Sequence, residues 1–346
     1  MSSKRALLLN KKNSPPTRPD LVHVKLMVLP LGLFVLACGG AASPPASVSV
    51  STEPTTETTP TQEPSVASEP ETPQVLILSE VGFQTPESVY FDKRRDVYLV
   101  SNINGSPTDV DGNGFISRLT PQSDGQVKIE LKFIDGTRKG TPLNAPKGLT
   151  VSGDTLYVAD IDRVRKFDAV SGAPKGEILL KGATFINDVA TGGDGSIYAS
   201  DSGLTPKFES SGTDAVYKIT PTDQVSALIK GATLGGPNGL IATEGGVWVA
   251  TFLSGELYWV SDAGEKKAAQ KLTPGQNDGL VYDNGGHLLV SSWEGSAVLS
   301  GQPNSEFRVT VSGLKAPADI GYDCSRNKLL IPLFTENKVV IQQLDK

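Results

Sequence analysis

The chain has 346 residues, of which 38% are hydrophobic and 20% are charged, and its formal net charge is −6 at pH 7. It contains two cysteines and two histidines. This composition argues against a disulfide-rich scaffold and against a zinc centre built on cysteine and histidine.

The N-terminal segment is basic and is followed by an apolar run from Leu26 to Ala37. About 12 apolar residues fall short of the roughly 20 that span a bilayer, which disfavours a transmembrane anchor. The run ends in the letters VLAC at Cys38, which resemble the lipobox of bacterial lipoproteins. We therefore expect a signal peptide over residues 1–37 and lipidation of Cys38. The lipid would be the chain's membrane contact in the bacterial cell envelope. Gly39 favours the outer membrane over the inner one.

Residues 38–73 are rich in Ser, Thr, Pro, Glu and Ala and nearly free of large apolar side chains. Such a segment cannot bury enough apolar surface to fold, so we expect a disordered tether. Removing residues 1–37 leaves 26 basic and 37 acidic residues, a formal charge of −11. We therefore expect a folded domain over residues 74–346 that has no nucleic-acid partner, because the two would repel each other.

A short phrase recurs within that domain: a polar residue, a small residue or Asp, and then a β-branched residue or Leu ahead of a second strand. Its six copies begin at Pro86, Pro146, Ile186, Pro237, Asn277 and Pro317. A period of about 40 to 60 residues with several strands per unit is typical of a β-propeller. We therefore predict an all-β, six-bladed propeller.

The last copy offers three strands, over residues 319–322, 328–332 and 338–344. The apolar run 75–79, ahead of the first copy, supplies the fourth. A last blade built from both ends of the domain closes the ring and protects its strand edges. The starts of the first strands, and the loops between second and third strands, then meet at one mouth of the central channel.

One position of the repeat stands at this mouth in every blade. It is occupied by Glu87, Lys147, Asn187, Asn238, Asp278 and Ala318. Two carboxylates and two amide oxygens suit a hard cation, Ca²⁺ before other divalent ions. A competing interpretation is that Asn238-Gly239 and Asp278-Gly279 are ordinary turn pairs. Glu87 and Asn187 are not part of such pairs, which favours metal ligation.

These phrases resemble the SMP-30/gluconolactonase family, which is itself similar to diisopropyl fluorophosphatase and the paraoxonases. The resemblance spans roughly residues 74–345. It implies a calcium ion held by Glu87, Asn187, Asn238 and Asp278, and hydrolysis of a lactone or ester. The metal would act as a Lewis acid, and Asp278 would activate water or attack directly. The chain departs from gluconolactonases at Ser88, where Gly-Pro is usual, and it lacks a paraoxonase-like histidine pair.

Three further side chains are predicted to contact the substrate. The ammonium of Lys147 either binds a substrate carboxylate or phosphate or pairs with a neighbouring carboxylate. Phe252 and Trp293 follow second strands and are expected to line the pocket. Asp188 and Asp319, one position beyond the ring, are expected to point away from the channel toward neighbouring blades.

Two long loops are expected over the same mouth. The loop of the first blade contains Asp109, Asp111 and Asn113, which match the first half of an EF-hand calcium loop. Its twelfth position is Thr120 instead of Glu, so a plain turn competes with a second calcium site. The other loop spans residues 201–213, and the two are predicted to form a rim or lid.

Two functions fit these features. The first is a monomeric calcium-dependent hydrolase of small-molecule lactones or related esters. The alternative is a propeller that binds a ligand or protein without catalysis. The four polar ring residues favour the enzyme, whereas Lys147 and Ala318 favour the scaffold. A condensing enzyme of the strictosidine synthase kind is similar in fold, but the catalytic Glu that it needs is not identifiable here. Specificity depends on the rim loops, so the substrate stays open.

Overall fold

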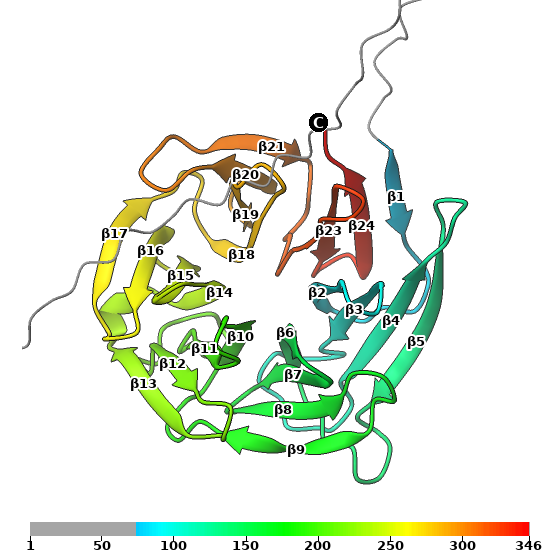
Figure 1. The fold of residues 1–346 in the computed structure, drawn as a ribbon, viewed down its shortest axis with the longest axis horizontal. Coiled ribbons are helices and arrows are strands. Elements are labelled where there is room, and N and C mark those ends of the chain that lie inside the picture. The colour runs from blue at the N-terminus through cyan, green and yellow to red at the C-terminus, as the bar shows by residue number, and fades with distance from the viewer. Residues whose placement is uncertain (1–73, 346) are drawn as a thin grey trace, which may run out of the picture. The chain divides into compact units, whose positions relative to one another are not determined.

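The computed structural model describes residues 74–345, which form six four-stranded antiparallel sheets arranged in a ring (Figure 1). The prediction of an all-β, six-bladed propeller is confirmed. The predicted signal peptide, the lipidation site Cys38 and the tether lie outside the described residues. Within the described part of the chain, no helix is long and apolar enough to cross a membrane.

The first five blades each use four consecutive strands, ordered from the channel outward. Blade 1 consists of β2 (Pro86–Asp92), β3 (Val97–Asn102), β4 (Phe115–Pro121) and β5 (Val127–Asp135). Blade 2 consists of β6 (Pro146–Ser152), β7 (Thr155–Asp160), β8 (Arg163–Asp168) and β9 (Pro174–Leu179). Blade 3 consists of β10 (Ile186–Thr191), β11 (Ile197–Asp201), β12 (Ala215–Ile219) and β13 (Val225–Lys230).

Blade 4 consists of β14 (Pro237–Thr243), β15 (Gly246–Thr251), β16 (Glu256–Ser261) and β17 (Lys266–Lys271). Blade 5 consists of β18 (Asn277–Tyr282), β19 (Leu288–Ser292), β20 (Ala297–Gly301) and β21 (Arg308–Ser312). A short 3-10 turn, η1 (Ala232–Leu234), precedes blade 4.

Blade 6 joins the two ends of the described chain. It consists of β22 (Gly321–Asp323), β23 (Lys328–Leu333), β24 (Lys338–Gln343) and β1 (Val75–Leu78). Strand β1 pairs antiparallel with β24, so that Leu78 lies opposite Val339. Strand β22 begins two residues later than predicted, because Pro317 and Asp319 make only isolated bridges to other strands. The pairing of β1 covers the edge of β24, which would otherwise be open to another chain.

The hydrophobic core lies between neighbouring blades. Leu99 and Ile116 of blade 1, for example, pack in one cluster with Leu149 and Val158 of blade 2. Inner strands are therefore buried on both faces, and all six residues of β3 are buried. The outermost strand β21 is largely exposed. This gradient explains why second strands such as β3, β19 and β23 consist mostly of apolar residues.

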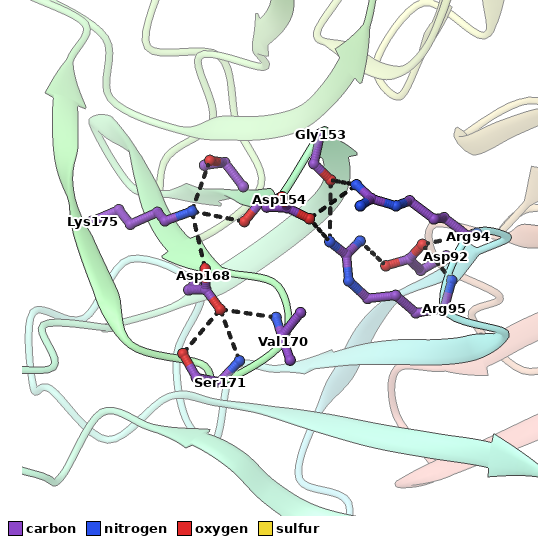
Figure 2. Close-up of polar contacts among 10 residues, drawn as sticks. Asp92, Arg94, Arg95, Gly153, Asp154, Asp168, Val170, Ser171 and Lys175 are labelled. Atoms are coloured by element: carbon purple, nitrogen blue, oxygen red, sulfur yellow. Dashed lines mark hydrogen bonds and ion pairs between the residues drawn. The ribbon is translucent and has the colours of Figure 1, made fainter.

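Ion pairs join blades 1 and 2 at the end of β2 that is far from Glu87 (Figure 2). Arg95 reaches both Asp92 at 2.8 Å and Asp154 at 2.6 Å, and Arg94 also contacts Asp154 at 2.9 Å. The exposed Arg94–Asp154 pair contributes at most about 1 kcal/mol, whereas the Arg95–Asp92 pair is largely buried. They fix the position of one blade against the next, while the apolar clusters supply most of the stability.

Candidate functional site

The inner strands of blades 1 to 5 are all interrupted by a β-bulge at the predicted ring position. In blade 1 the register of the β2–β3 ladder shifts between Pro86 and Val89. Equivalent shifts occur in β6, β10, β14 and β18. A bulge takes residues out of the ladder and re-aims their side chains. The first bulged residue of each blade lines a cavity at the channel mouth; these residues are Glu87, Lys147, Asn187, Asn238 and Asp278.

The second bulged residue is a glycine in three blades. Close packing between blades leaves no room for a side chain at these positions. A Cβ atom at Gly239 would lie 2.3 Å from the backbone oxygen of Asp278, and one at Gly279 would lie 2.3 Å from the backbone nitrogen of Ile320. The inner strand of the next blade passes too close for any side chain. Both glycines lie inside strands, so the alternative interpretation of turn pairs is wrong.

Serines of the second strands hold three of the bulges. The hydroxyls of Ser101, Ser200 and Ser291 accept hydrogen bonds from the second bulged residue's N–H at 2.9, 3.0 and 2.7 Å. Ser200 and Ser291 also donate to the carbonyls of Asn238 and Ala318 in the next blade, both at 2.7 Å. The sequence analysis missed these serines. The recurrence of a serine in the second strands of alternate blades could have indicated their role.

The five polar ring residues converge on one small cavity. Their side chains are all buried, and the cavity between them has a volume of about 20 Å³. A cavity needs roughly 10–15 Å³ to hold one water molecule or ion. Ala318, the sixth ring residue, is fully buried and offers no polar side-chain atom. The residues predicted from the repeat are therefore brought together around a space of ionic size.

Each of the four predicted metal ligands has a buried oxygen without a hydrogen-bond partner. These atoms are Glu87 Oε2, Asn187 Oδ1, Asn238 Oδ1 and Asp278 Oδ1. The amide of Asn187 is oriented because its Nδ2 donates to Ser202 Oγ at 2.9 Å. A buried acceptor left unpaired costs about 1–3 kcal/mol. Four such acceptors around one space fit a hard cation, which bonds to oxygen and needs no donor.

The donor set also limits the kind of metal. Among residues 74–345 there is no group of three or more His, Cys, Asp or Glu side chains that could hold an ion. The candidate site has two carboxylates and takes its other oxygens from amides. A set made of oxygen alone suits Ca²⁺ or a similar hard cation and does not suit zinc.

Several buried carboxyl groups lie close together at this site, and their pKa values are raised. Burial raises the pKa of Glu87 well above its usual range, and repulsion from Asp278 and Asp319 raises it further. Burial and then Asp319 likewise raise the pKa of Asp278. Burial raises the pKa of Asp319 to about 7. A bound cation would offset the repulsion between these carboxylates and lower all three pKa values.

Asp188 and Asp319 differ in part from expectation, because they line the channel as well as contact neighbouring blades. Both face a second cavity of about 370 Å³ bounded by the inner strands of all six blades. Asp188 accepts hydrogen bonds from the backbone N–H groups of Val189 at 2.6 Å and Leu240 at 2.7 Å. The bulge in β10 turns Asp188 toward the axis while its oxygens still reach backbone groups, whereas the Asp319 carboxylate accepts from the Ser88 hydroxyl of blade 1.

Lys147 places an ammonium group in the ring cavity. Its Nζ donates to the backbone carbonyl of Ala145 at 3.1 Å and lies 4.5 Å from the centroid of the Phe185 ring. Burial lowers the pKa of Lys147 to about 8, although Glu87 and Asp160 act in the opposite direction. The ammonium is thus held by a carbonyl and an aromatic face, with donors left over for a ligand.

Aromatic side chains form the wall beyond the ring. Phe252 and Trp293 line the cavity, where the sequence analysis expected them, and their ring centroids lie 5.3 Å apart. Phe334 lies 5.2 Å from Trp293, and Phe208 lies 6.0 Å from Phe252. The sequence analysis missed these last two. Phe334 could have been predicted, because it directly follows its blade's second strand as Phe252 and Trp293 do.

Each of the two long loops contributes one residue to the lining of the cavity. Phe208, in the loop between β11 and β12, lines the cavity, and so does Pro107 of the blade 1 loop. In that loop Asp109 and Asp111 are exposed. Asn113 donates to Asp111 from Nδ2 at 2.6 Å and from its backbone N–H at 3.3 Å. This pattern is that of an Asx turn and favours the plain turn over a second calcium site.

No family model and no curated protein matches the chain. Solved structures match it by fold. A gluconolactonase from Xanthomonas campestris is 18% identical with a TM-score of 0.56, covering 79% of this chain and 90% of that one. A luciferin-regenerating enzyme is 15% identical with a TM-score of 0.57, covering 79% and 95%. Virginiamycin B lyase from Staphylococcus aureus is 14% identical with a TM-score of 0.54, covering 79% and 100%. At these identities the likeness establishes the propeller fold alone.

Proposed function

We propose that this protein is a metal-dependent hydrolase of lactones or related esters, with Ca²⁺ in the ring cavity. The observation that carries the proposal is the set of four converging, unpartnered oxygens on Glu87, Asn187, Asn238 and Asp278. A scaffold would gain stability by pairing or replacing them. A site that binds a cation keeps them free.

Calcium, when bound by these four residues, would supply Lewis acidity toward the substrate carbonyl. Asp278 is the proposed catalytic residue. Its unpartnered Oδ1 belongs to a buried carboxylate, from which it would remove a proton from water or attack the carbonyl carbon itself. In the net reaction one water is consumed, the acyl C–O bond breaks, and a carboxylate, an alcohol and one released proton form.

Lys147 would support the same reaction by electrostatics. Its ammonium lines the cavity together with Asp278 and has N–H groups beyond the one that binds Ala145. Negative charge that develops on the carbonyl oxygen would be stabilised by such a fixed cation in a space with little water. The aromatic wall would help by excluding bulk solvent.

The alternative of a binding propeller without catalysis keeps one specific argument. Burial lowers the pKa of Lys147, but Glu87 acts in the opposite direction, so the ring holds part of its own counter-charge. We further propose, from the sequence alone, that Cys38 anchors the protein in the bacterial envelope.

Hydrolysis measured with and without EDTA separates the two functions. A panel of lactones and esters should be turned over by the calcium-loaded protein, lose turnover with EDTA and recover it on adding Ca²⁺. The absence of turnover for the whole panel, despite bound calcium, would overturn the enzymatic proposal and favour the binding scaffold.

A further inference from the structure

We propose that the cavity selects lactones or esters that carry an aryl or alkyl group over hydroxyl-rich sugar lactones, with Phe208 as the specificity-determining residue. This inference rests on the proposed function and names its substrate class. It is drawn from the wall of the cavity, whose one part in the proposed reaction is to exclude bulk solvent.

The wall beyond the ring is apolar on every side. Its residues are Ile103, Pro107, Phe185, Leu204, Phe208, Phe252, Trp293 and Phe334. Hydroxyl groups of a sugar would be buried against these side chains with few partners, which is unfavourable for each hydroxyl. An aryl or alkyl group would instead gain from burial and from contact with the aromatic rings.

The wall has one polar atom that points to the substrate's orientation. The indole Nε1 of Trp293 is buried and has no hydrogen-bond partner. Burial raises the pKa of Asp278, and the indole N–H of Trp293 acts in the opposite direction, so this donor lies beside the carboxylate without meeting full hydrogen-bond geometry. A substrate oxygen near Asp278 would satisfy this donor, and the apolar group would then face the Phe208 side of the cavity, where the other rings cluster.

Phe208 is the wall residue best placed to move. The cavity holds about one water as it stands, so a substrate needs one side chain to shift. Phe185 and Phe252 are buried. Trp293 and Phe334 are half-buried like Phe208, but each directly follows a strand, whereas Phe208 lies within the loop between β11 and β12. Its turn is closed on itself, because Thr205 N–H donates to Glu209 O at 2.8 Å and Phe208 N–H to Thr205 O at 2.9 Å. The turn can therefore keep its shape when it swings.

The backbone of Phe208 supports a role beyond packing. Its φ angle is +60°, in the left-handed region that bulky side chains rarely adopt. Phe208 holds this conformation because the hydrogen-bonded turn over residues 205–209 enforces it. Here the strained residue is the one whose ring contacts Phe252 and Trp293, at centroid distances of 6.0 and 6.1 Å.

The test compares γ-phenyl-γ-butyrolactone with glucono-δ-lactone. The kcat/KM of the wild-type protein should be about 100-fold or more higher for the phenyl lactone than for the sugar lactone. An apolar pocket discriminates against one added hydroxyl group by about this factor. Phe208→Ala should raise KM for the phenyl lactone at least about tenfold and leave the sugar lactone unchanged or improved. Phe307→Ala is the matched control, a half-buried phenylalanine of blade 5 outside the cavity. Preference for the sugar lactone, or equal losses on both substrates, would overturn the inference.

A binding measurement keeps the inference separate from the proposed function. In the Trp248→Phe/Trp259→Phe variant, Trp293 is the single tryptophan, and its fluorescence reports on the cavity. The lactam 5-phenylpyrrolidin-2-one should change this signal, and gluconolactam should not. A response to the phenyl lactam without any lactone turnover would reject the hydrolase and retain the apolar site. Turnover of sugar lactones without that response would do the reverse.

Discussion

The hydroxyl of Ser88 in blade 1 donates a hydrogen bond to the carboxylate of Asp319 in blade 6. The same two residues form a parallel backbone bridge, and the Asp319 N–H donates to the carbonyl of Glu87 at 2.8 Å. Glu87, the first predicted metal ligand, is therefore positioned by the seam where the first and last blades meet. Ring closure and site geometry depend on each other.

The closing strand should matter for stability. Leu78 of β1 is 7% exposed and packs with residues of blades 1 and 6, whereas its neighbour Ile77 is 57% exposed. Leu78→Ala should lower the free energy of unfolding by roughly 2–5 kcal/mol, because it leaves a cavity in the core. Ile77→Ala in the same strand is the control and should change it by less than about 0.5 kcal/mol. Thermal or urea unfolding measures both, and equal effects would mean that β1 is not part of the stable ring.

Removing a carboxylate from the ring should weaken calcium binding. We expect the metal-stripped protein to bind Ca²⁺ in a calorimetric titration, and Asp278→Asn and Glu87→Gln each to lose affinity by about tenfold or more, because affinity follows the number of charged ligands. Asp111→Asn is the control in the exposed loop of blade 1.

Identical titrations for the wild type, Asp278→Asn and Glu87→Gln would reject the ring as a metal site. Loss of affinity in Asp111→Asn alone would move the calcium site to that loop.

The metal-free protein should lose stability as pH rises. The pKa of Asp319 is about 7 in the folded chain and near 3.8 when solvated. Between these values the folded state holds more protons at Asp319 than the unfolded state, so the contribution of Asp319 to the free energy of unfolding falls with rising pH and levels off above about 7. Unfolding in EDTA at pH 5 and pH 8 should show this loss, and Asp319→Asn should reduce it.

Asp109→Asn is the matched control for this pH dependence, because Asp109 is exposed. Its slope should equal that of the wild type. A wild-type protein that becomes more stable between pH 5 and pH 8 would show that the carboxylates near the axis are compensated without metal.

The repeat made the fold and the ring residues predictable. Because six copies superimpose, differences between them, such as Glu87 against Asn187, could be interpreted as positions around one axis. Contacts between blades were less visible. The need for glycine at Gly239 arises from the backbone of Asp278 in the next blade, and no local pattern in the chain reports that approach.

The same limit explains the other differences. The bulge that turns Asp188 toward the axis shifts a two-residue alternation that the sequence alone cannot show. Phe208 lies in a loop without periodicity, and its place over the cavity depends on contacts with Phe252 and Trp293. Strand interiors follow from local patterns, whereas loop positions follow from tertiary contacts.

Lys147 should oppose calcium and assist turnover. Its ammonium lines the same cavity as the four predicted ligands, so Lys147→Met should remove a repulsion and tighten Ca²⁺ binding several-fold at neutral pH. It should also lower kcat, because a fixed positive charge near the carbonyl oxygen is lost.

Since the pKa of Lys147 is about 8, wild-type calcium affinity should rise as pH increases through 8, and the variant should lack this rise. Lys230→Met is the control, an exposed lysine 4.8 Å from the Tyr217 ring. Weaker calcium binding in Lys147→Met would show that the lysine maintains the ring geometry instead of competing with the ion.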